Sequence, residues 1–166
     1  LRRTPDDVER AIGLGCRVRL CKGAYLEPPA VAFPAKRDVD AAYLRCMRTL
    51  MERGRYPGLA THDPAIIAEA QAFARRQGIA AERFEFQMLY GVRRDLQEQL
   101  VRDGWRLRVD VPFGTQWYPY LMRRLAERPA NLAFITGNIL REMAGSASGG
   151  LRGGRRGGRG RGRGAE

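Results

Sequence analysis

The sequence of 166 residues has no apolar run approaching the ~18–20 residues of a membrane-spanning helix, and it shows no secretory signal peptide. Its three cysteines, Cys16, Cys21 and Cys46, form neither a CxxC pair nor an even set, so we expect reduced thiols in a cytoplasmic protein and assign no metal site. No GxGxxG pattern follows any of the expected strands, which counts against a dinucleotide-binding Rossmann unit.

Positive charge is abundant but unevenly distributed. The formal net charge is +12, and residues 145–166 contribute +5 of it, from six arginines and one acid, together with ten of the 20 glycines. The remaining +7 is dispersed among acids over residues 1–144, so no focused nucleic-acid patch is indicated there. We therefore expect one folded domain over residues 1–144 and a disordered Arg-Gly tail over residues 145–166, through which RNA could bind.

Hydrophobic periodicity divides residues 1–144 into alternating helices and strands. We expect Thr4 at the N-cap of the first helix and Asp63 at the N-cap of the third. The expected strands are residues 17–21, 59–62, 83–89 and 106–111, and the expected helices are residues 5–14, 38–53, 64–77, 92–101, 118–128 and 131–142. Four strand–helix alternations at spacings of roughly 25–40 residues indicate βαβ units in a parallel sheet.

Three of the expected strands carry polar side chains at alternate positions. Because helices should cover the apolar face, these side chains are expected to face a barrel-like interior: Arg17 and Arg19, Glu85 and Gln87, and Arg106, Arg108 and Asp110. A complete (β/α)8 barrel needs eight strands and about 250 residues. The pattern therefore predicts an α/β fold with a partial (β/α)8 TIM barrel, and the start at Leu1 rather than Met suggests a fragment.

Four motifs stand out in the sequence: residues 19–25 (RLCKGAY), 60–63 (ATHD), 84–91 (FEFQMLYG) and 111–125 (VPFGTQWYPYLMRRL). They resemble those of proline dehydrogenase and occur in that family's order over about residues 1–142. The resemblance implies strands 5 to 8 of a distorted (β/α)8 barrel that binds FAD and oxidises L-proline to Δ1-pyrroline-5-carboxylate. It also implies a quinone-type electron acceptor, which leaves a peripheral membrane contact open.

The resemblance assigns a role to each matching residue. Arg19 corresponds to the catalytic arginine beside flavin N5, where a fixed cation stabilises charge on the reduced ring. The implied cofactor contacts are Lys22, Gly23, Ala24, Thr61, His62 and Gln87, and the implied substrate contacts are Arg123, Arg124, Leu89 and Tyr25. Without the motifs, a surface lysine, a core leucine and a packed tyrosine would be the ordinary interpretations.

The chain departs from the family pattern in two respects. Asp110 stands where the family usually has a tyrosine, and we hypothesise that its carboxylate pairs with Arg123 and competes with substrate. An earlier lysine and an earlier aspartate of the family barrel have no counterpart, so the isolated chain is expected to be incomplete and inactive. Two alternatives stay open: a flavin barrel acting on hydroxyproline or a related imino acid, and a non-catalytic basic protein that binds RNA through the Arg-Gly tail.

Overall fold

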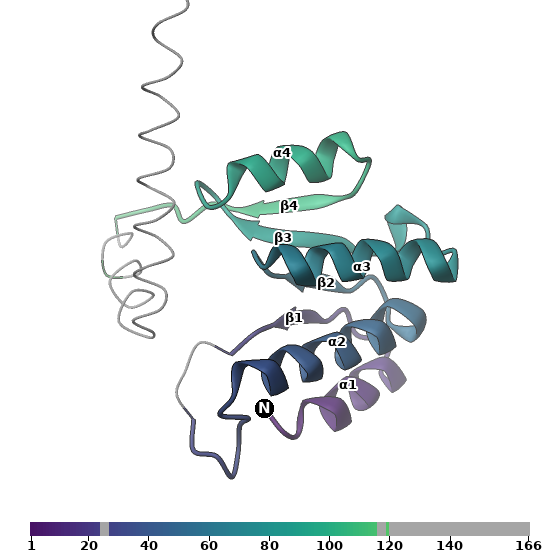
Figure 1. Ribbon diagram of the computed structural model, residues 1–166, viewed down its shortest axis with the longest axis vertical. Helices are drawn as coiled ribbons and strands as arrows, with labels where there is room; N and C mark the ends of the chain where they lie inside the picture. Colours follow the sequence, from purple (N-terminus) through teal and green to yellow (C-terminus); the bar gives the residue numbers. More distant parts are fainter. Residues whose placement is uncertain (24–26, 116–118, 120–166) are drawn as a thin grey trace, which may run out of the picture.

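The computed structural model describes residues 1–23, 27–115 and 119, which contain a parallel sheet covered by helices (Figure 1). The strands are β1 (Arg19–Cys21), β2 (Gly58–Ala60), β3 (Glu85–Leu89) and β4 (Leu107–Asp110). The helices are α1 (Thr4–Gly13), α2 (Lys36–Arg53), α3 (Pro64–Gln77) and α4 (Arg94–Arg102), with a short 3-10 turn η1 (Ala81–Arg83) before β3.

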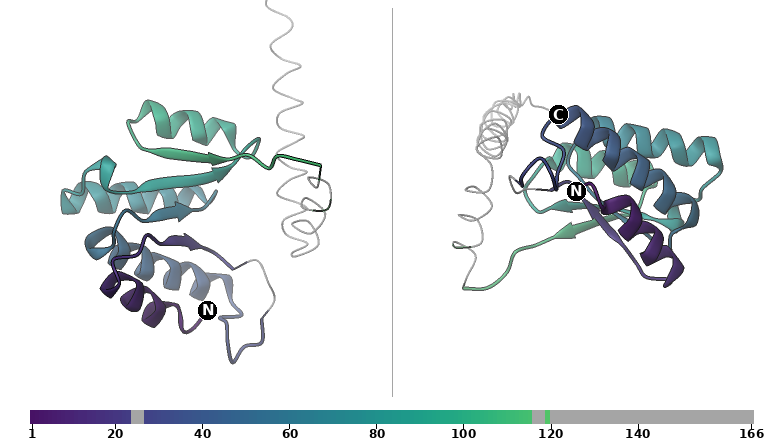
Figure 2. Two further views of the ribbon diagram at one scale, coloured as in Figure 1. Left: turned by 180° about the vertical axis from the view of Figure 1, so that it is seen from behind. Right: turned by 90° about the horizontal axis from the view of Figure 1, so that it is seen from below.

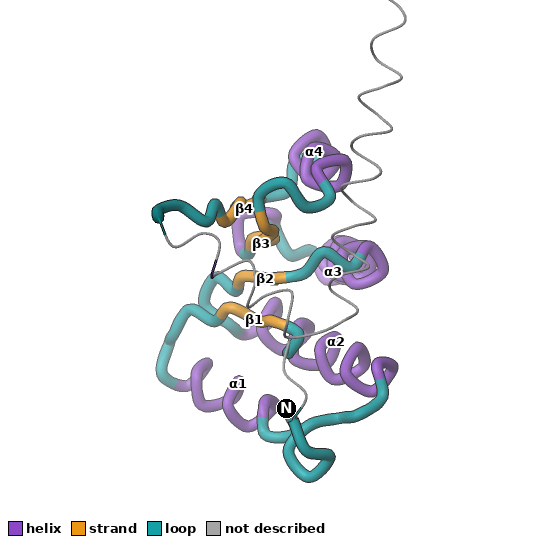
Figure 3. Tube along the Cα trace, turned by 90° about the vertical axis from the view of Figure 1, so that its left-hand side faces the viewer, coloured by secondary structure: helices purple, strands orange, loops and turns teal. Residues whose placement is uncertain are grey.

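The sheet has the order β1-β2-β3-β4, so each strand pairs in parallel with the next one in the sequence. Helices α2, α3 and α4 make the three crossovers, and all three lie on the same side of the strands (Figure 3). Helix α1 packs against α2. The βαβ units predicted from the sequence are therefore confirmed.

The register of the sheet separates an apolar face from a polar one. Leu20, Leu59, Phe86 and Leu107 lie level with one another, and their side chains belong to the core beneath the helices. Because side chains alternate along a strand, the residues before and after them point to the opposite face. None of the described helices covers this face, which we call the helix-free face and which is seen from behind the molecule in the left view of Figure 2.

The hydrophobic core fills the space between the sheet and the helices. An aromatic group of Phe84, Phe86 and Trp105 sits at one end of it, with ring centroids 5.5–6.2 Å apart. Its largest fully buried side chains are Phe84, Phe86, Met47, Leu50, Met51, Leu59, Ile67, Met88 and Leu100. One continuous core thus holds the four strands in register and presents their other face.

The helix boundaries agree only in part with those expected. Asp63 caps α3 as predicted, because its carboxylate accepts a hydrogen bond of 3.0 Å from the backbone N–H of Ala65. The prediction that Thr4 caps α1 is wrong: Thr4 is the first helical residue, and Arg3 occupies the cap position without a side-chain cap. An ion pair of 2.7 Å between Arg3 and Asp7 stabilises this end instead.

Strand ends also differ from the expected ones. Arg17 and Arg106 lie before β1 and β4 rather than within them, and both guanidinium groups stack over the ring of Tyr56, at 5.0 Å and 5.9 Å from its centroid. They therefore belong to the amino-terminal rim of the strands. The expected helices over residues 118–128 and 131–142 and the tail over residues 145–166 lie outside the described residues, apart from Pro119.

Truncating a core side chain tests this packing. Leu50 is fully buried in α2, so Leu50→Ala should lower the free energy of unfolding by about 2–5 kcal/mol, measured by urea denaturation. Leu50→Met should cost less than about 1.5 kcal/mol, since it conserves volume. As a control, Leu14→Ala removes a side chain that is 76% exposed and should change stability by no more than about 0.5 kcal/mol. Equal losses for the two alanine variants would contradict the described core.

Candidate functional site

The polar residues singled out by the motifs gather at the carboxyl ends of the strands. Lys22 directly follows β1, His62 follows β2 by two residues, and Leu89 and Asp110 are the last residues of β3 and β4. The carboxyl ends of parallel strands meet at one edge of a sheet, which is where (β/α)8 barrels place their chemistry. The topology therefore brings residues from four separate βα units to one side of the fold.

An ion pair between Arg19 and Asp110 spans the helix-free face. Nη2 of Arg19 donates to Oδ2 of Asp110, joining the first strand to the last. Partial burial works to lower the pKa of Arg19, but this hydrogen bond and the charge of Asp110 raise it above its ordinary value. The hypothesis that Asp110 pairs with Arg123 lies outside the described residues, within which Asp110 contacts Arg19 instead.

Glu85 organises a second polar cluster on the same face. The Arg108 guanidinium donates to both of its carboxylate oxygens, at 2.6 Å and 3.1 Å, and the Tyr56 hydroxyl donates to it at 3.0 Å. Glu85 is only 6% exposed, and the hydrogen bonds from Arg108 hold its pKa below the usual range. A carboxylate in such surroundings stays ionised at neutral pH.

Gln87 also binds Glu85, and this contact orients its amide. Nε2 of Gln87 donates to Oε1 of Glu85 at 2.7 Å, which directs the amide oxygen of Gln87 elsewhere. That oxygen is buried and accepts no hydrogen bond within the described part of the chain. The side chain lies over Gly58, where an added Cβ would be 2.3 Å from Nε2, so a larger residue here would have to displace the Gln87 amide.

His62 is a partly buried, neutral hydrogen-bond acceptor. Its Nε2 accepts a hydrogen bond of 2.9 Å from the backbone N–H of Leu89, which places the ring proton on Nδ1. Burial, helped by the positive charge of Arg93, lowers the pKa of His62 to about 4. Next to it, the Thr61 hydroxyl accepts a hydrogen bond of 3.1 Å from the backbone N–H of Asp63.

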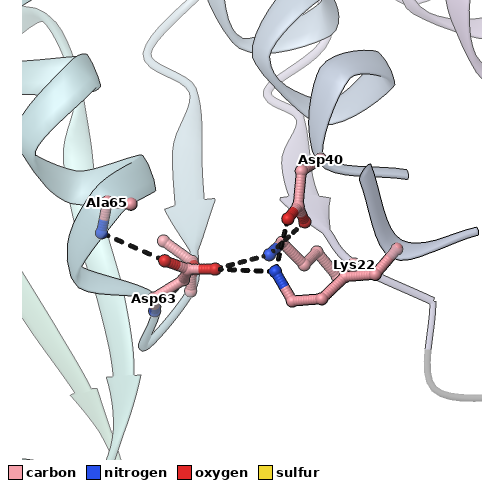
Figure 4. Close-up of polar contacts among 6 residues, drawn as sticks. Lys22, Asp40, Asp63 and Ala65 are labelled. Carbon is pink, nitrogen blue, oxygen red and sulfur yellow. Dashed lines mark hydrogen bonds and ion pairs between the residues drawn. The ribbon is translucent and has the colours of Figure 1, made fainter. Parts of the chain in front are cut away.

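Lys22 lies between two carboxylates (Figure 4). Its Nζ is 2.5 Å from Oδ1 of Asp40 and 2.8 Å from Oδ2 of Asp63, and Lys36 pairs with the same two acids. Partial burial works to raise the pKa of Asp63, but the hydrogen bond and charge of Lys22 hold it below the usual range. Lys22 thereby ties the end of β1 to the beginnings of α2 and α3.

The structure describes only some of the remaining motif residues. Gly23 is described, and an added Cβ would meet nothing within 4 Å, so its surroundings within the described chain are open. Leu89 is partly buried on the face that carries Gln87. The assigned roles of Ala24, Tyr25, Arg123 and Arg124 lie outside the described residues.

Sequence reasoning overlooked two partners of this site. Asp40 was expected only as part of a helix, although its spacing of four residues from Lys36 indicates an ion pair on one helix face. Gly58 was placed outside the expected strand over residues 59–62, although it begins β2, where a glycine indicates close approach by another group.

Comparison with known proteins identifies the family. A model of the family described as proline dehydrogenase matches residues 6–137. The chain belongs to the proline dehydrogenase family. It is 49% identical over 124 residues to the proline dehydrogenase of Deinococcus radiodurans, covering 75% of this chain and 40% of that protein. It is 45% identical over 142 residues to proline dehydrogenase 1 of Bacillus subtilis, covering 86% of this chain and 47% of that protein.

A solved structure of the family shows the same fold. It is the crystal structure of proline utilization A (PutA) from Bdellovibrio bacteriovorus inactivated by N-propargylglycine. The TM-score is 0.69 at 30% sequence identity, covering 75% of this chain and 15% of that one. The predicted partial (β/α)8 barrel is thus confirmed for a proline dehydrogenase chain that spans less than half the length of these curated relatives. Among the described residues, no helix is long and apolar enough to cross a membrane.

The protonation state of His62 can be measured by NMR without ambiguity, because it is the only histidine of the sequence. Its imidazole NMR signals should titrate with a midpoint of about 4 instead of the ordinary 6.5. At pH values between about 4 and 6.5, His62 therefore binds a proton in the unfolded chain but not in the folded chain. Stability should therefore fall by about 2–3 kcal/mol as the pH is lowered from 6.5 to 4. His62→Gln should remove most of this slope, whereas a midpoint near 6.5 would contradict the partly buried position.

The packing of Gln87 over β2 makes Gly58 sensitive to substitution. Gly58→Ala should lower the free energy of unfolding by about 1–3 kcal/mol, because the new methyl group displaces an amide that Glu85 holds in place. The double variant Gly58→Ala/Gln87→Ala should recover most of the loss in urea denaturation. Gly13→Ala, where an added Cβ meets nothing, is the matched control. A loss that persists in the double variant would show that another contact is responsible.

Proposed function

We propose that this chain forms part of a flavoenzyme that binds FAD and oxidises L-proline to Δ1-pyrroline-5-carboxylate, with electrons passing to a quinone-type acceptor. Membership of the proline dehydrogenase family supports the substrate and the reaction. The observation that carries the cofactor proposal is the buried Gln87 amide oxygen, which accepts no hydrogen bond from the described residues. A buried acceptor without a donor is costly unless a ligand supplies one.

The residues of the helix-free face fit a flavin. The ring system of FAD carries one N–H donor, which matches the Gln87 acceptor, and Arg19 places a cation on the same face. Gly58 adds no side chain of its own there, so the Gln87 amide can lie over β2 on this face. When bound, FAD supplies the acceptor for a hydride from the C5 carbon of proline.

The side chains of the chain prepare this reaction without changing protonation at neutral pH. Glu85 fixes the orientation of the Gln87 amide, so that the acceptor is preorganised. The Arg19 guanidinium is a permanent cation suited to stabilising negative charge that develops during hydride transfer. His62 is neutral, and its Nε2 already accepts from Leu89, so it acts as a fixed support rather than as an acid.

Further contacts in this proposal follow the family motifs. The additional cofactor contacts are Lys22, Gly23, Ala24, Thr61 and His62, and the substrate contacts are Leu89, Tyr25, Arg123 and Arg124. Two adjacent arginines suit the proline carboxylate, because planar guanidinium groups bind carboxylates in a bidentate manner. The Lys22 ammonium has three N–H donors, so its contacts with Asp40 and Asp63 leave one donor for a cofactor phosphate.

We also propose that this chain is inactive by itself. Within the described residues, β1 and β4 each pair on one side only, whereas a closed barrel pairs every strand on both sides. The chain spans 40–47% of the length of the relatives, so the other strands of a complete barrel would supply the missing walls of the site. The proposed location is cytoplasmic, with a peripheral contact to the membrane where a quinone is the acceptor.

A flavin titration tests the cofactor proposal. FAD is added to the protein containing a complete barrel, and its absorbance and fluorescence are followed. Gln87→Ala should weaken FAD binding by about 5–100-fold, the range for losing a buried hydrogen bond. Gln99→Ala, which removes an exposed amide of α4, is the matched control and should leave the affinity unchanged. Absence of flavin binding and of proline oxidation in the complete barrel would refute the proposed function.

A further inference from the structure

The Arg19–Asp110 ion pair runs diagonally across the sheet. In the register of the strands, Arg19 is level with Gly58 and Glu85, whereas Asp110 is level with Leu89 at the end of β3. The guanidinium therefore extends toward the carboxyl ends of the strands to reach the carboxylate.

The nearer acid on this face is already engaged. Glu85 stands level with Arg19, but its two oxygens are bound by Arg108, Gln87 and Tyr56. A further guanidinium would have to displace one of these donors from a buried carboxylate. The sheet thus carries two separate acid–arginine pairs, one near each end of its strands.

We propose that Asp110 is a positioning residue for Arg19: it draws the guanidinium to the carboxyl-terminal end of the sheet and holds it there. The Arg19 side chain is 50% exposed and that of Asp110 is 28% exposed. A long exposed side chain visits many rotamers unless an interaction selects one of them. Asp110 supplies that interaction from the strand farthest from Arg19.

This inference deepens the proposed function and rests on it in one respect. A carboxylate in contact with Arg19 also reduces the positive potential that the guanidinium places on neighbouring groups. If Arg19 faces a flavin, Asp110 makes the reduced cofactor less stable than an unpaired arginine would. Asp110 would then set both the position of the cation and the strength of its field.

The position of Arg19 can be measured without a cofactor. In the full chain labelled with ¹⁵N, the Nη–H signals of Arg19, whose Nη2 donates to Asp110, are assigned by their loss in Arg19→Lys. The proposal expects slow proton exchange at this group in the native chain and loss of that protection in Asp110→Asn. Asp110→Glu keeps the negative charge on a longer stem and should restore most of the protection.

Matched variants and a second readout make the outcome unambiguous. Asp103→Asn removes the same charge from an exposed site at the end of α4 and should leave the Arg19 signal unchanged. Preserved amide shifts elsewhere in the Asp110→Asn spectrum show that the chain is folded. A folded Asp110→Asn chain whose Arg19 signal is unaltered overturns the proposal, as does an equal loss in Asp103→Asn.

The redox potential separates this inference from the proposed function. In the FAD-loaded enzyme with a complete barrel, Asp110→Asn should raise the flavin midpoint potential, and Asp103→Asn should not. Lost protection of Arg19 together with an unchanged potential would support the positioning of Arg19 by Asp110. The same result would refute the placement of Arg19 beside the flavin.

Discussion

Charge pairing on the helix-free face of the sheet is the constraint on which the site depends. Guanidinium and ammonium groups in partly buried positions are costly unless an acid accompanies them. Glu85 forms an ion pair with Arg108, and Asp110 forms one with Arg19. Lys22 forms ion pairs with Asp40 and Asp63, at the starts of α2 and α3. These pairs connect strands and helices that are distant in the sequence, so they align the βα units with one another at the surface where ligands are expected.

The arrangement of the sheet was largely predictable from the sequence. Alternation of apolar and polar residues identified the two faces of β3 and β4, and Asp63-Pro64 with Gly78 marked both ends of α3. The start of α1 was not predictable in the same way, because Thr4 is a good cap residue and the competing Arg3–Asp7 pair depends on the geometry of the first turn. Boundaries are decided by such local competition rather than by periodicity.

The sequence predicted which residues belong to the site, but not which residues they contact. Motifs placed Arg19, Lys22, His62 and Gln87 on or just after successive strands, and the structure brings these strands side by side in one sheet. Their partners could not be inferred, because the distance from Arg19 to Asp110 along the chain is 91 residues and no local pattern links them. Ion pairs across a sheet depend on register and twist, which single-sequence periodicity does not specify.

The sequential strand order has a consequence for how the chain acquires its structure. Each strand pairs with the one made just before it, so every crossover closes a loop of only one helix and its flanking turns. Pairing strands that are neighbours in the sequence costs less loop-closure entropy than pairing strands that are farther apart along the chain. During synthesis the sheet can therefore grow strand by strand as the ribosome releases successive βα units, each adding to an edge that is already formed.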